Sequence, residues 1–481
     1  MSGLWFFSCH AGRLSAALPA LMLLGACVSA PELAPPAGLA PTGDWAAARS
    51  LAAPARDWPA ESWWRAYGDA QLDALIDEAV ADAPSLQVAA ARLRRAEAGV
   101  RIADAARGPQ VSGRAAAEMT KQSYNLLVPR QQLPQGWDSY GRATLDFSWE
   151  LDFWGRNRAA LAAATTDLDA RRAEFAQSRL MLAAAMASHY AELSRLHASR
   201  DTALRALEIR ARTASLFTQR FGNGLETRGS LRDADARRAV AEGALLAVEE
   251  QIALQRNRIA ALLGAGPDRG LAIARPALAL DRAFGLPAQL HFDLLGRRPD
   301  VTAARLRAEA AARRIDVAEA EFYPNVNLAG FVGLQALGLD RITRNGSEIG
   351  SVGPAISLPI FNGGRLKAQY AGRRAEYDEA VADYRATVAR ALQEVADNAV
   401  SQQALGQRLD KADEAVDAAT EAHRVARDRY EGGLANALEV LSAEDRLLDS
   451  LSARTNLRAL SWTLDIDLQR ALGGGYRLAA R

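Results

Sequence analysis

Two proline-free stretches of equal length constrain the fold of this chain more than any other feature. One runs from Arg365 to Arg429 and is rich in Ala, Arg, Glu and Leu. The other runs from Arg156 to Arg220, 209 residues earlier. At ~1.5 Å per residue, a continuous helix of this length would be roughly 96 Å long, far beyond the ordinary globular helix. The sequence therefore predicts two very long helices of matched length.

A seven-residue repeat of seam positions runs along both stretches, and it is typical of a left-handed coiled coil. One polar residue interrupts each seam at the same place, His189 in the first copy and Asn398 in the second. As a ligand or proton carrier, His189 would need a partner cluster, and its nearest histidine is His197. We interpret both as polar seam residues that set the helix register. The seams are Leu161, Leu168, Phe175, Leu182, His189 and Leu196, and then Tyr370, Tyr377, Tyr384, Ala391, Asn398 and Leu405.

Each long helix is expected to end at a glycine turn, because glycine adopts the left-handed conformation that closes a helix. A returning helix should follow over 229–262 in the first copy and 436–471 in the second. Ser230 with Asp233, and Asn436 with Glu439, are spaced like a helix cap and its third residue. The turns contain Arg220, Phe221 and Gly224, and then Arg429, Tyr430 and Gly433.

Apolar and polar residues alternate in four segments, which predicts β-strands at about 110–121, 139–151, 325–334 and 350–360. A helix bracketed by prolines precedes each strand pair. Gly363-Gly364 before a helix would also fit a phosphate loop, but the Lys-Ser/Thr completion is missing. We therefore interpret these glycines as a strand–helix junction. The expected junction residues are Pro109, Gly155, Pro324 and Gly364.

These elements form two tandem repeats, 61–270 and 299–473, joined by a connector at 271–298 and followed by a tail at 474–481. The fold class is mainly α, with long antiparallel helical hairpins and a small β part. Four strands leave open edges, which cannot face lipid. Eight strands would be filled by their own side chains. Three chains giving twelve strands are the smallest assembly that we expect to leave an open lumen.

Residues 1–26 resemble an export signal, with an apolar run from Leu14 to Leu24. A plain signal peptide would explain that run alone. Leu24-Gly25-Ala26-Cys27 also resembles the bacterial lipoprotein box, in which the cysteine is lipidated, and Val28 at the next position implies sorting to the outer membrane. Cys27 would then carry diacylglycerol and an N-acyl chain, and 27–60 would be a lipidated linker. With Cys9 removed, no disulfide could form.

No residue pattern predicts chemistry. The carboxylates lie on long amphipathic helices, where ion pairs at three- and four-residue spacing are the ordinary arrangement. The five histidines are scattered, so we expect no metal site and no cofactor beyond the acyl chains. The net charge of +1, with acids and bases interleaved, argues against a nucleic-acid groove. We predict that the protein is not an enzyme.

From Cys27 to Gly473 the sequence is similar to the TolC and OprM type outer membrane efflux proteins, in particular their lipoprotein, NodT-like branch. Each motif is short, but their order and spacing are specific together. The matching motifs are Trp63-Trp64, Gly68-Asp69, Trp149-Glu150-Leu151-Asp152, Gly155-Arg156, Arg298-Pro299-Asp300, Phe322-Tyr323-Pro324, Pro359-Ile360-Phe361-Asn362-Gly363-Gly364-Arg365 and Gln393-Glu394-Val395.

The resemblance implies a homotrimer, with a twelve-stranded barrel in the outer membrane and a twelve-helix periplasmic tunnel. It also implies docking to a periplasmic adaptor and an inner membrane pump of the resistance-nodulation-division type. The two glycine turns would be the periplasmic tip, where the family closes its tunnel. Glu439, Ser442 and Ser230 would then line the constriction, with one carboxylate per chain in place of an expected pair. Glu439 would alternatively, or additionally, cap its helix.

We therefore expect an outer membrane exit duct that passively conducts drugs or other small solutes. An exit duct for type I protein secretion is an alternative within the same class. A lipid-anchored periplasmic coiled-coil scaffold is an alternative from another class, and it requires the alternating segments to be soluble loops.

Overall fold

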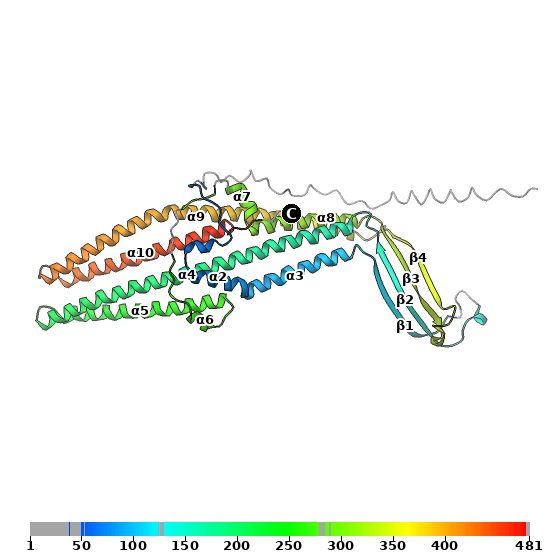
Figure 1. The fold of residues 1–481 in the computed structure, drawn as a ribbon, viewed down its shortest axis with the longest axis horizontal. Helices are drawn as coiled ribbons and strands as arrows, with labels where there is room; N and C mark the ends of the chain where they lie inside the picture. The colour runs from blue at the N-terminus through cyan, green and yellow to red at the C-terminus, as the bar shows by residue number, and fades with distance from the viewer. Residues whose placement is uncertain are drawn as a thin grey trace, which may run out of the picture. The chain divides into compact units, whose positions relative to one another are not determined.

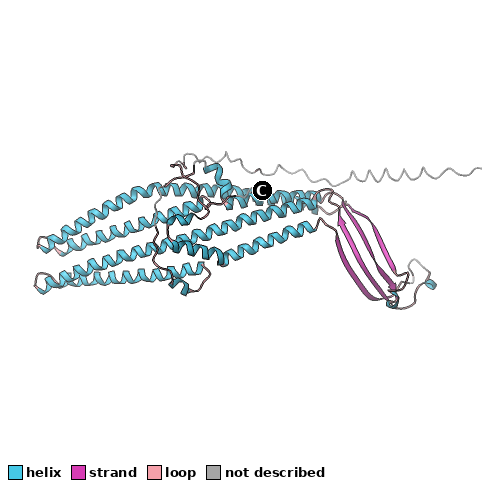
Figure 2. Cartoon of the chain, in the orientation of Figure 1, coloured by secondary structure: helices cyan, strands magenta, loops and turns pink. Residues whose placement is uncertain are grey.

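A computed structural model describes residues 38, 50–51, 53–123, 125, 129–278, 284–287 and 290–477. The described residues form helices and one four-stranded antiparallel sheet (Figure 2), which confirms the predicted fold class. The predicted signal peptide and the predicted lipid attachment site, Cys27, lie outside the described residues. The described chain forms two compact units, one of residues 94–170 and 305–383 and another that includes residues 171–278 and 384–477.

The first unit holds the sheet, in the order β1-β2-β3-β4 (Figure 1). Its strands are β1 (Gln110–Thr120), β2 (Asp138–Glu150), β3 (Asn325–Leu337) and β4 (Glu348–Ser357). Strand β3 is longer than predicted because residues 335–337 pair with β2, and β4 begins earlier than predicted because Glu348 pairs with Leu334. Strand β4 ends before Pro359, a residue that has no N–H to donate.

One face of the sheet carries apolar side chains and the other carries polar ones, as the alternation predicts. Leu145 pairs with Val332 across β2 and β3, and both are more than half exposed. On the opposite face, Arg114 lies 3.7 Å from Asp146. The sheet thus presents an unusual exposed apolar surface. Among the described residues, the outer edges of β1 and β4 pair with no other strand.

The long helices are α4 (Arg156–Gly222) and α9 (Arg365–Glu431), each ending two residues beyond its predicted end. The returning helices are α5 (Arg228–Leu262) and α10 (Ala437–Ala471). Shorter helices are α2 (Ala70–Asp82), α3 (Pro84–Ala105), α6 (Pro267–Leu271), α7 (Leu290–Arg297) and α8 (Pro299–Ala320). None of the described helices contains an apolar stretch long enough to cross a membrane.

The core of the second unit joins the N-terminal aromatic residues to the long helices. The Tyr67 hydroxyl donates to Asp465 at 2.7 Å, and the Tyr190 hydroxyl donates to Asp69 at 2.8 Å. Asp69 also caps α2 by accepting from the backbone. Both hydrogen bonds lie in the core cluster that contains Trp63 and Trp64, and each pairs a buried tyrosine hydroxyl with a carboxylate.

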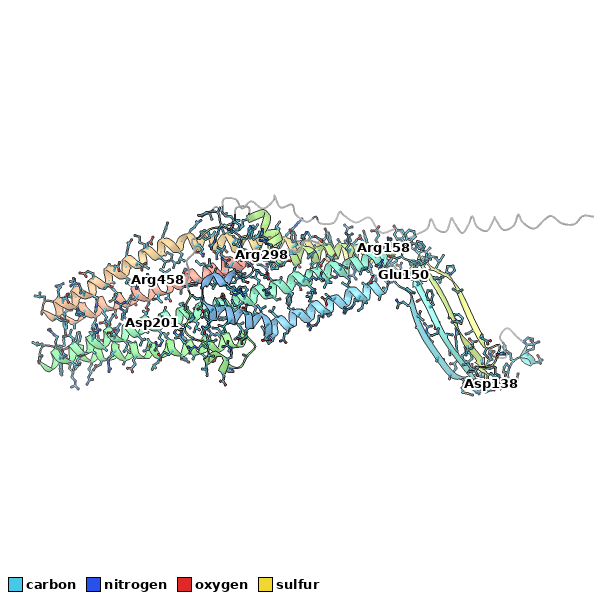
Figure 3. The ribbon with its side chains drawn as sticks, viewed as in Figure 1. Asp138, Glu150, Arg158, Asp201, Arg298 and Arg458 are labelled. Atoms are coloured by element: carbon cyan, nitrogen blue, oxygen red, sulfur yellow. The ribbon has the colours of Figure 1, made fainter. Side chains whose placement is uncertain are left out.

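A buried arginine ties three helices of the second unit together. Arg298, which is labelled in Figure 3, is 4% exposed. Its guanidinium donates to Asp300, to Glu394 of α9 at 2.9 Å and to the carbonyl of Ala471 at 3.0 Å. Burial acts to lower the pKa of Arg298, but the negative charges and hydrogen bonds of Asp300 and Glu394 outweigh it and raise that pKa. The Arg298-Pro299-Asp300 motif therefore fixes the start of α8 against α9 and the end of α10.

The two polar seam residues make equivalent contacts. His189 lies 3.0 Å from the Gln255 side chain through its Nδ1, and the Asn398 amide donates to the carbonyl of Leu464 at 2.8 Å. Gln255 and Leu464 are themselves 209 residues apart. Burial, helped by Arg258, lowers the pKa of His189. Both contacts fit a register-setting role, which stays a prediction.

Candidate functional site

The candidate site is the tip of the second unit, where the α4–α5 and α9–α10 hairpins turn at the same end (Figure 1). Gly224 has φ 72° and Gly433 has φ 73°, a conformation that favours glycine. In each turn the N–H of a leucine closes back on the long helix: Leu225 donates to the Arg220 carbonyl at 2.8 Å and Leu434 to the Arg429 carbonyl at 2.7 Å. The two turns have matching backbones.

One of the two returning helices has the predicted cap residue and the other does not. Asn436 caps α10 as expected, since its side chain accepts from the N–H of Glu439 at 3.0 Å. The cap of α5 is Thr227, which accepts from the N–H of Ser230 at 3.1 Å, so the prediction of Ser230 as the cap is wrong. Because α5 begins at Arg228, Ser230 is already its third residue. Thr227 and Asn436 are 209 residues apart, so the repeat offset was the signal for the correct cap.

A tyrosine of the α9–α10 hairpin is buried against the α4–α5 hairpin. Tyr430 is 1% exposed, and its ring centroid lies 5.2 Å from that of the buried Phe217. The Arg220 guanidinium lies 4.4 Å from the centre of the Tyr430 ring and donates to the Tyr430 carbonyl at 3.1 Å. The Tyr430 hydroxyl donates to the Glu226 carboxylate. We call these four residues the tyrosine lock: Phe217, Arg220, Glu226 and Tyr430.

The electrostatics of the lock follow from its burial and hydrogen bonds. Burial, and then the Glu226 carboxylate, raise the pKa of Tyr430, so its hydroxyl stays a donor. Burial acts to raise the pKa of Glu226, but hydrogen bonds from Tyr430, the Thr227 N–H and Ser230 outweigh it and lower that pKa. A neutral tyrosine therefore faces an ionised glutamate, which makes a charge-assisted hydrogen bond.

A second link between the hairpins was not predicted. Glu444 is fully buried, accepts from the Thr213 hydroxyl at 2.7 Å and lies 3.3 Å from the Arg210 guanidinium. Asp445 accepts from Arg210 at 2.7 Å and from Arg237 at 2.8 Å. Burial raises the pKa of Glu444. Nothing in the local sequence marks these residues, because their partners lie more than 200 positions away.

The three predicted constriction residues each bond within their own hairpin. Glu439 lies 3.6 Å from Arg429. The Ser442 hydroxyl accepts from Arg446 at 2.9 Å, and Ser230 shares a 2.9 Å hydrogen bond with Thr227. Glu439 is the third residue of α10, and its N–H donates to the side chain of the cap residue Asn436. Their role at a constriction stays a prediction.

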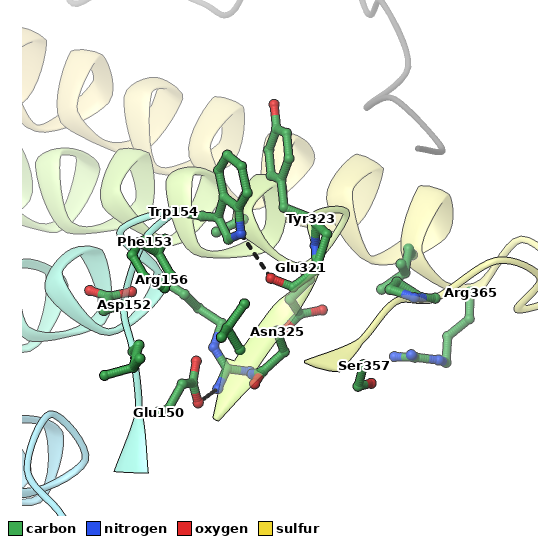
Figure 4. A pocket seen from close by; sticks show the side chains of 16 residues that line it. Glu150, Asp152, Phe153, Trp154, Arg156, Glu321, Tyr323, Asn325, Ser357 and Arg365 are labelled. Carbon is green, nitrogen blue, oxygen red and sulfur yellow. Dashed lines mark hydrogen bonds and ion pairs between the residues drawn. The ribbon is translucent and has the colours of Figure 1, made fainter. Parts of the chain in front are cut away.

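The predicted junction residues lie where strands meet helices in the first unit. Gly155 and Gly364 have φ of 80° and 86° immediately before α4 and α9, and Pro109 and Pro324 immediately precede β1 and β3. Figure 4 shows Trp154, whose indole N–H donates to the Pro324 carbonyl at 2.8 Å. The Trp154 ring stacks on the Tyr323 ring, with 4.8 Å between the two ring centroids. Glycines turn the chain here, and aromatic packing stabilises the turn.

The family model for "Outer membrane efflux protein" matches residues 75–265 and 291–474, one segment in each repeat. The chain belongs to the outer membrane efflux protein family. In the described residues, no group of three or more His, Cys, Asp or Glu side chains could hold a metal ion. The match to the family model confirms the resemblance stated from the sequence motifs.

Several relatives of this outer membrane efflux protein carry resistance in their names. The fusaric acid resistance protein FusA of Burkholderia cepacia is 37% identical over 74% of this chain and 68% of its own length. The multidrug resistance outer membrane protein MdtQ of Escherichia coli O157:H7 is 31% identical, covering 87% of this chain and 89% of the relative. MdtP of Escherichia coli K12 is 29% identical over 87% of both chains.

Solved structures share the fold over most of this outer membrane efflux protein. The outer membrane protein VceC of Vibrio cholerae is 45% identical, with a TM-score of 0.82 over 87% of this chain and 100% of its own. The outer-membrane channel OprN is 28% identical, with a TM-score of 0.82 over 93% of this chain and 99% of its own. The helical hairpins and the four-stranded sheet are thus those of an outer membrane channel.

Proposed function

We propose that this protein is the exit duct of a tripartite efflux system in the outer membrane, and that it passively conducts drugs or other small solutes. The observation that carries the proposal is the pairing, in each repeat, of two strands with one long helical hairpin. An exposed apolar sheet face suits lipid, and long hairpins suit the wall of a tunnel. No catalytic step belongs to this function.

The sheet supports a trimeric assembly. Val352 and Ile356 on β4 are 78% and 70% exposed on the apolar face, which a soluble loop would not display. Three sheets joined edge to edge would give twelve strands and remove every open edge. This argues against the coiled-coil scaffold, which requires the alternating segments to be soluble loops.

The tip supports docking of a periplasmic adaptor. Leu225 and Leu434 stand at equivalent positions of the two turns and are 63% and 74% exposed. Six such leucines in a trimer would form an apolar ring that a helical adaptor tip could cover. A resistance-nodulation-division pump in the inner membrane would then supply the substrate, in keeping with the multidrug resistance names of the relatives.

The lipid anchor rests on the sequence alone. Diacylglycerol and an N-acyl chain at Cys27 would hold the N-terminus at the outer membrane. Cys27→Ser should abolish incorporation of labelled palmitate while the helical content is unchanged. Continued labelling would refute the proposed attachment site.

Reconstitution tests the duct itself. The purified full chain should run as a trimer by native mass spectrometry in detergent, and it should give stepwise conductance in planar lipid bilayers.

If Glu439 lines the constriction, Glu439→Ala should reduce the preference for cations, measured as a shift in reversal potential under a salt gradient. Asp268→Asn, in α6, is the matched control. A monomer without conductance would refute the exit-duct proposal, and an unchanged reversal potential would leave Glu439 with its helix-capping position alone.

A further inference from the structure

The two tip hairpins bury their equivalent aromatic residues very differently. Tyr430 and Phe221 occupy the same position of the repeat, 209 residues apart, immediately before their turns. Tyr430 is 1% exposed because the α4–α5 hairpin covers it. Phe221 is 41% exposed. The first hairpin thus presents an aromatic ring on the face that corresponds to the covered face of the second.

The arginines at equivalent positions of the two hairpins also differ in their contacts. Arg220 lies over the Tyr430 ring within the chain. Its equivalent, Arg429, has a side chain that is 54% exposed and lies 3.6 Å from Glu439 and 3.2 Å from the Leu434 carbonyl. The second hairpin therefore presents an arginine on the face that corresponds to the ring-binding face of the first. The contact between the two hairpins thus leaves one ring and one cation exposed.

We propose that Phe221 of each chain binds under Arg429 of a second copy, so that the contact between copies repeats the Arg220–Tyr430 contact within one chain. The inference rests on the trimer of the proposed function. The contact is heterologous, because one surface of a copy meets a different surface of the next, and such contacts form a ring when the rotation closes. Within a ring, hairpins of the two types alternate, and every aromatic–arginine pair is used.

The contact between copies lacks the polar links of the contact within the chain. Phe221 has no hydroxyl, and the repeat equivalent of Glu226 is Ala435. Arg210 and Asp445, which pair across the hairpins of one chain, correspond to Ala419 and Ala236. At these repeat-equivalent positions, the proposed contact between copies therefore has fewer hydrogen bonds and ion pairs than the contact within the chain.

Paired cysteines test this geometry. In the purified full chain, Phe221→Cys with Arg429→Cys should give covalent dimers and trimers on denaturing gels after treatment with a short bis-maleimide. Arg220→Cys with Tyr430→Cys is the matched control, since these positions meet within one chain and should stay at monomer mass. Untreated protein, wild type and each single cysteine variant show any background reaction.

Two outcomes overturn the inference in distinguishable ways. If native mass spectrometry finds a trimer but the Phe221/Arg429 pair stays at monomer mass, the proposed contact is wrong and the trimer stands. If no trimer forms in the wild type, the assembly in the proposed function fails as well. As a second measurement, Phe221→Arg should lower the temperature at which trimers dissociate, and adding Arg429→Phe should restore it. Failure of the double variant to restore it also counts against the pairing.

Discussion

The α4–α5 and α9–α10 hairpins have the same backbone and opposite environments. Their turns use the same glycine conformation and the same closing hydrogen bond. Yet Tyr430 and Glu444 of the second hairpin are buried, whereas their equivalents Phe221 and Asp235 in the first are exposed or half-buried. The difference shows that a repeat can reproduce local structure while the neighbouring elements decide which face is covered. The predictions below test that contrast.

The largest effect is expected at the aromatic core of the tip. Phe217 is 0% exposed and packs on Tyr430. Phe217→Ala should lower the local free energy of unfolding by about 3–5 kcal/mol, because it leaves a cavity. Hydrogen exchange of tip amides measures this loss. Leu225→Ala, at an exposed turn position, should change it by less than about 0.5 kcal/mol. Equal exchange in the two variants would contradict the assigned packing.

Removing the buried carboxylate of Glu444 should cost more local stability than removing the carboxylate of its repeat equivalent, Asp235. Glu444→Ala leaves Thr213 and Arg210 without one partner, which should cost about 2–3 kcal/mol of local stability. Asp235→Ala removes only a surface pair with Arg232 and should cost about 0.5 kcal/mol or less. The same exchange measurement compares them. Similar losses would show that burial does not distinguish the two positions.

The tyrosine lock should make the tip sensitive to acid. The folded-state pKa of Glu226 lies below its ordinary value of 4.5, so its stabilisation is present above pH 4.5 and is lost as pH falls through the lower folded pKa. Tip protection should therefore fall on acidification in the wild type and change less in Glu226→Gln. Tyr430→Phe should cost about 1–2 kcal/mol near neutral pH. A steeper acid dependence in Glu226→Gln would reverse the assigned sign.

The smallest effect should be the same in both hairpins. Thr227→Ala and Asn436→Ala each remove one side-chain acceptor at a helix start, at about 1 kcal/mol. Exchange rates in the first turns of α5 and α10 should rise by similar factors. A large difference between the two caps would show that the matching backbones do not have matching local stability.

Most of the fold could be predicted because it is local. Gly155 and Gly364 mark the starts of α4 and α9, and period-two alternation marks the strands. The inexact predictions concern strand ends that depend on pairing with a neighbouring strand, such as the end of β3 on β2 and the start of β4 on β3. The wrong cap arose because Ser230 and Thr227 are both competent cap residues, and only the start of α5 distinguishes them.

The candidate site was predicted in position but not in its contacts. The turns at Gly224 and Gly433 follow from glycine chemistry and the repeat offset. The hydrogen bond between Tyr430 and Glu226, and the pairing of Arg210 with Asp445, join residues separated by more than 200 positions. No periodicity links such residues, because their proximity depends on two hairpins packing side by side.

The sequence by itself determined the lengths of the helices, their matched turns, the two-faced strands and membership of the outer membrane efflux family. Each of these depends on backbone conformation, side-chain periodicity or motif order, which are encoded within short stretches. Only the tertiary structure decided that Tyr430 is enclosed and Phe221 is left open. The physical reason is that burial is a property of what packs against a residue, and two equivalent residues of a repeat have different neighbours.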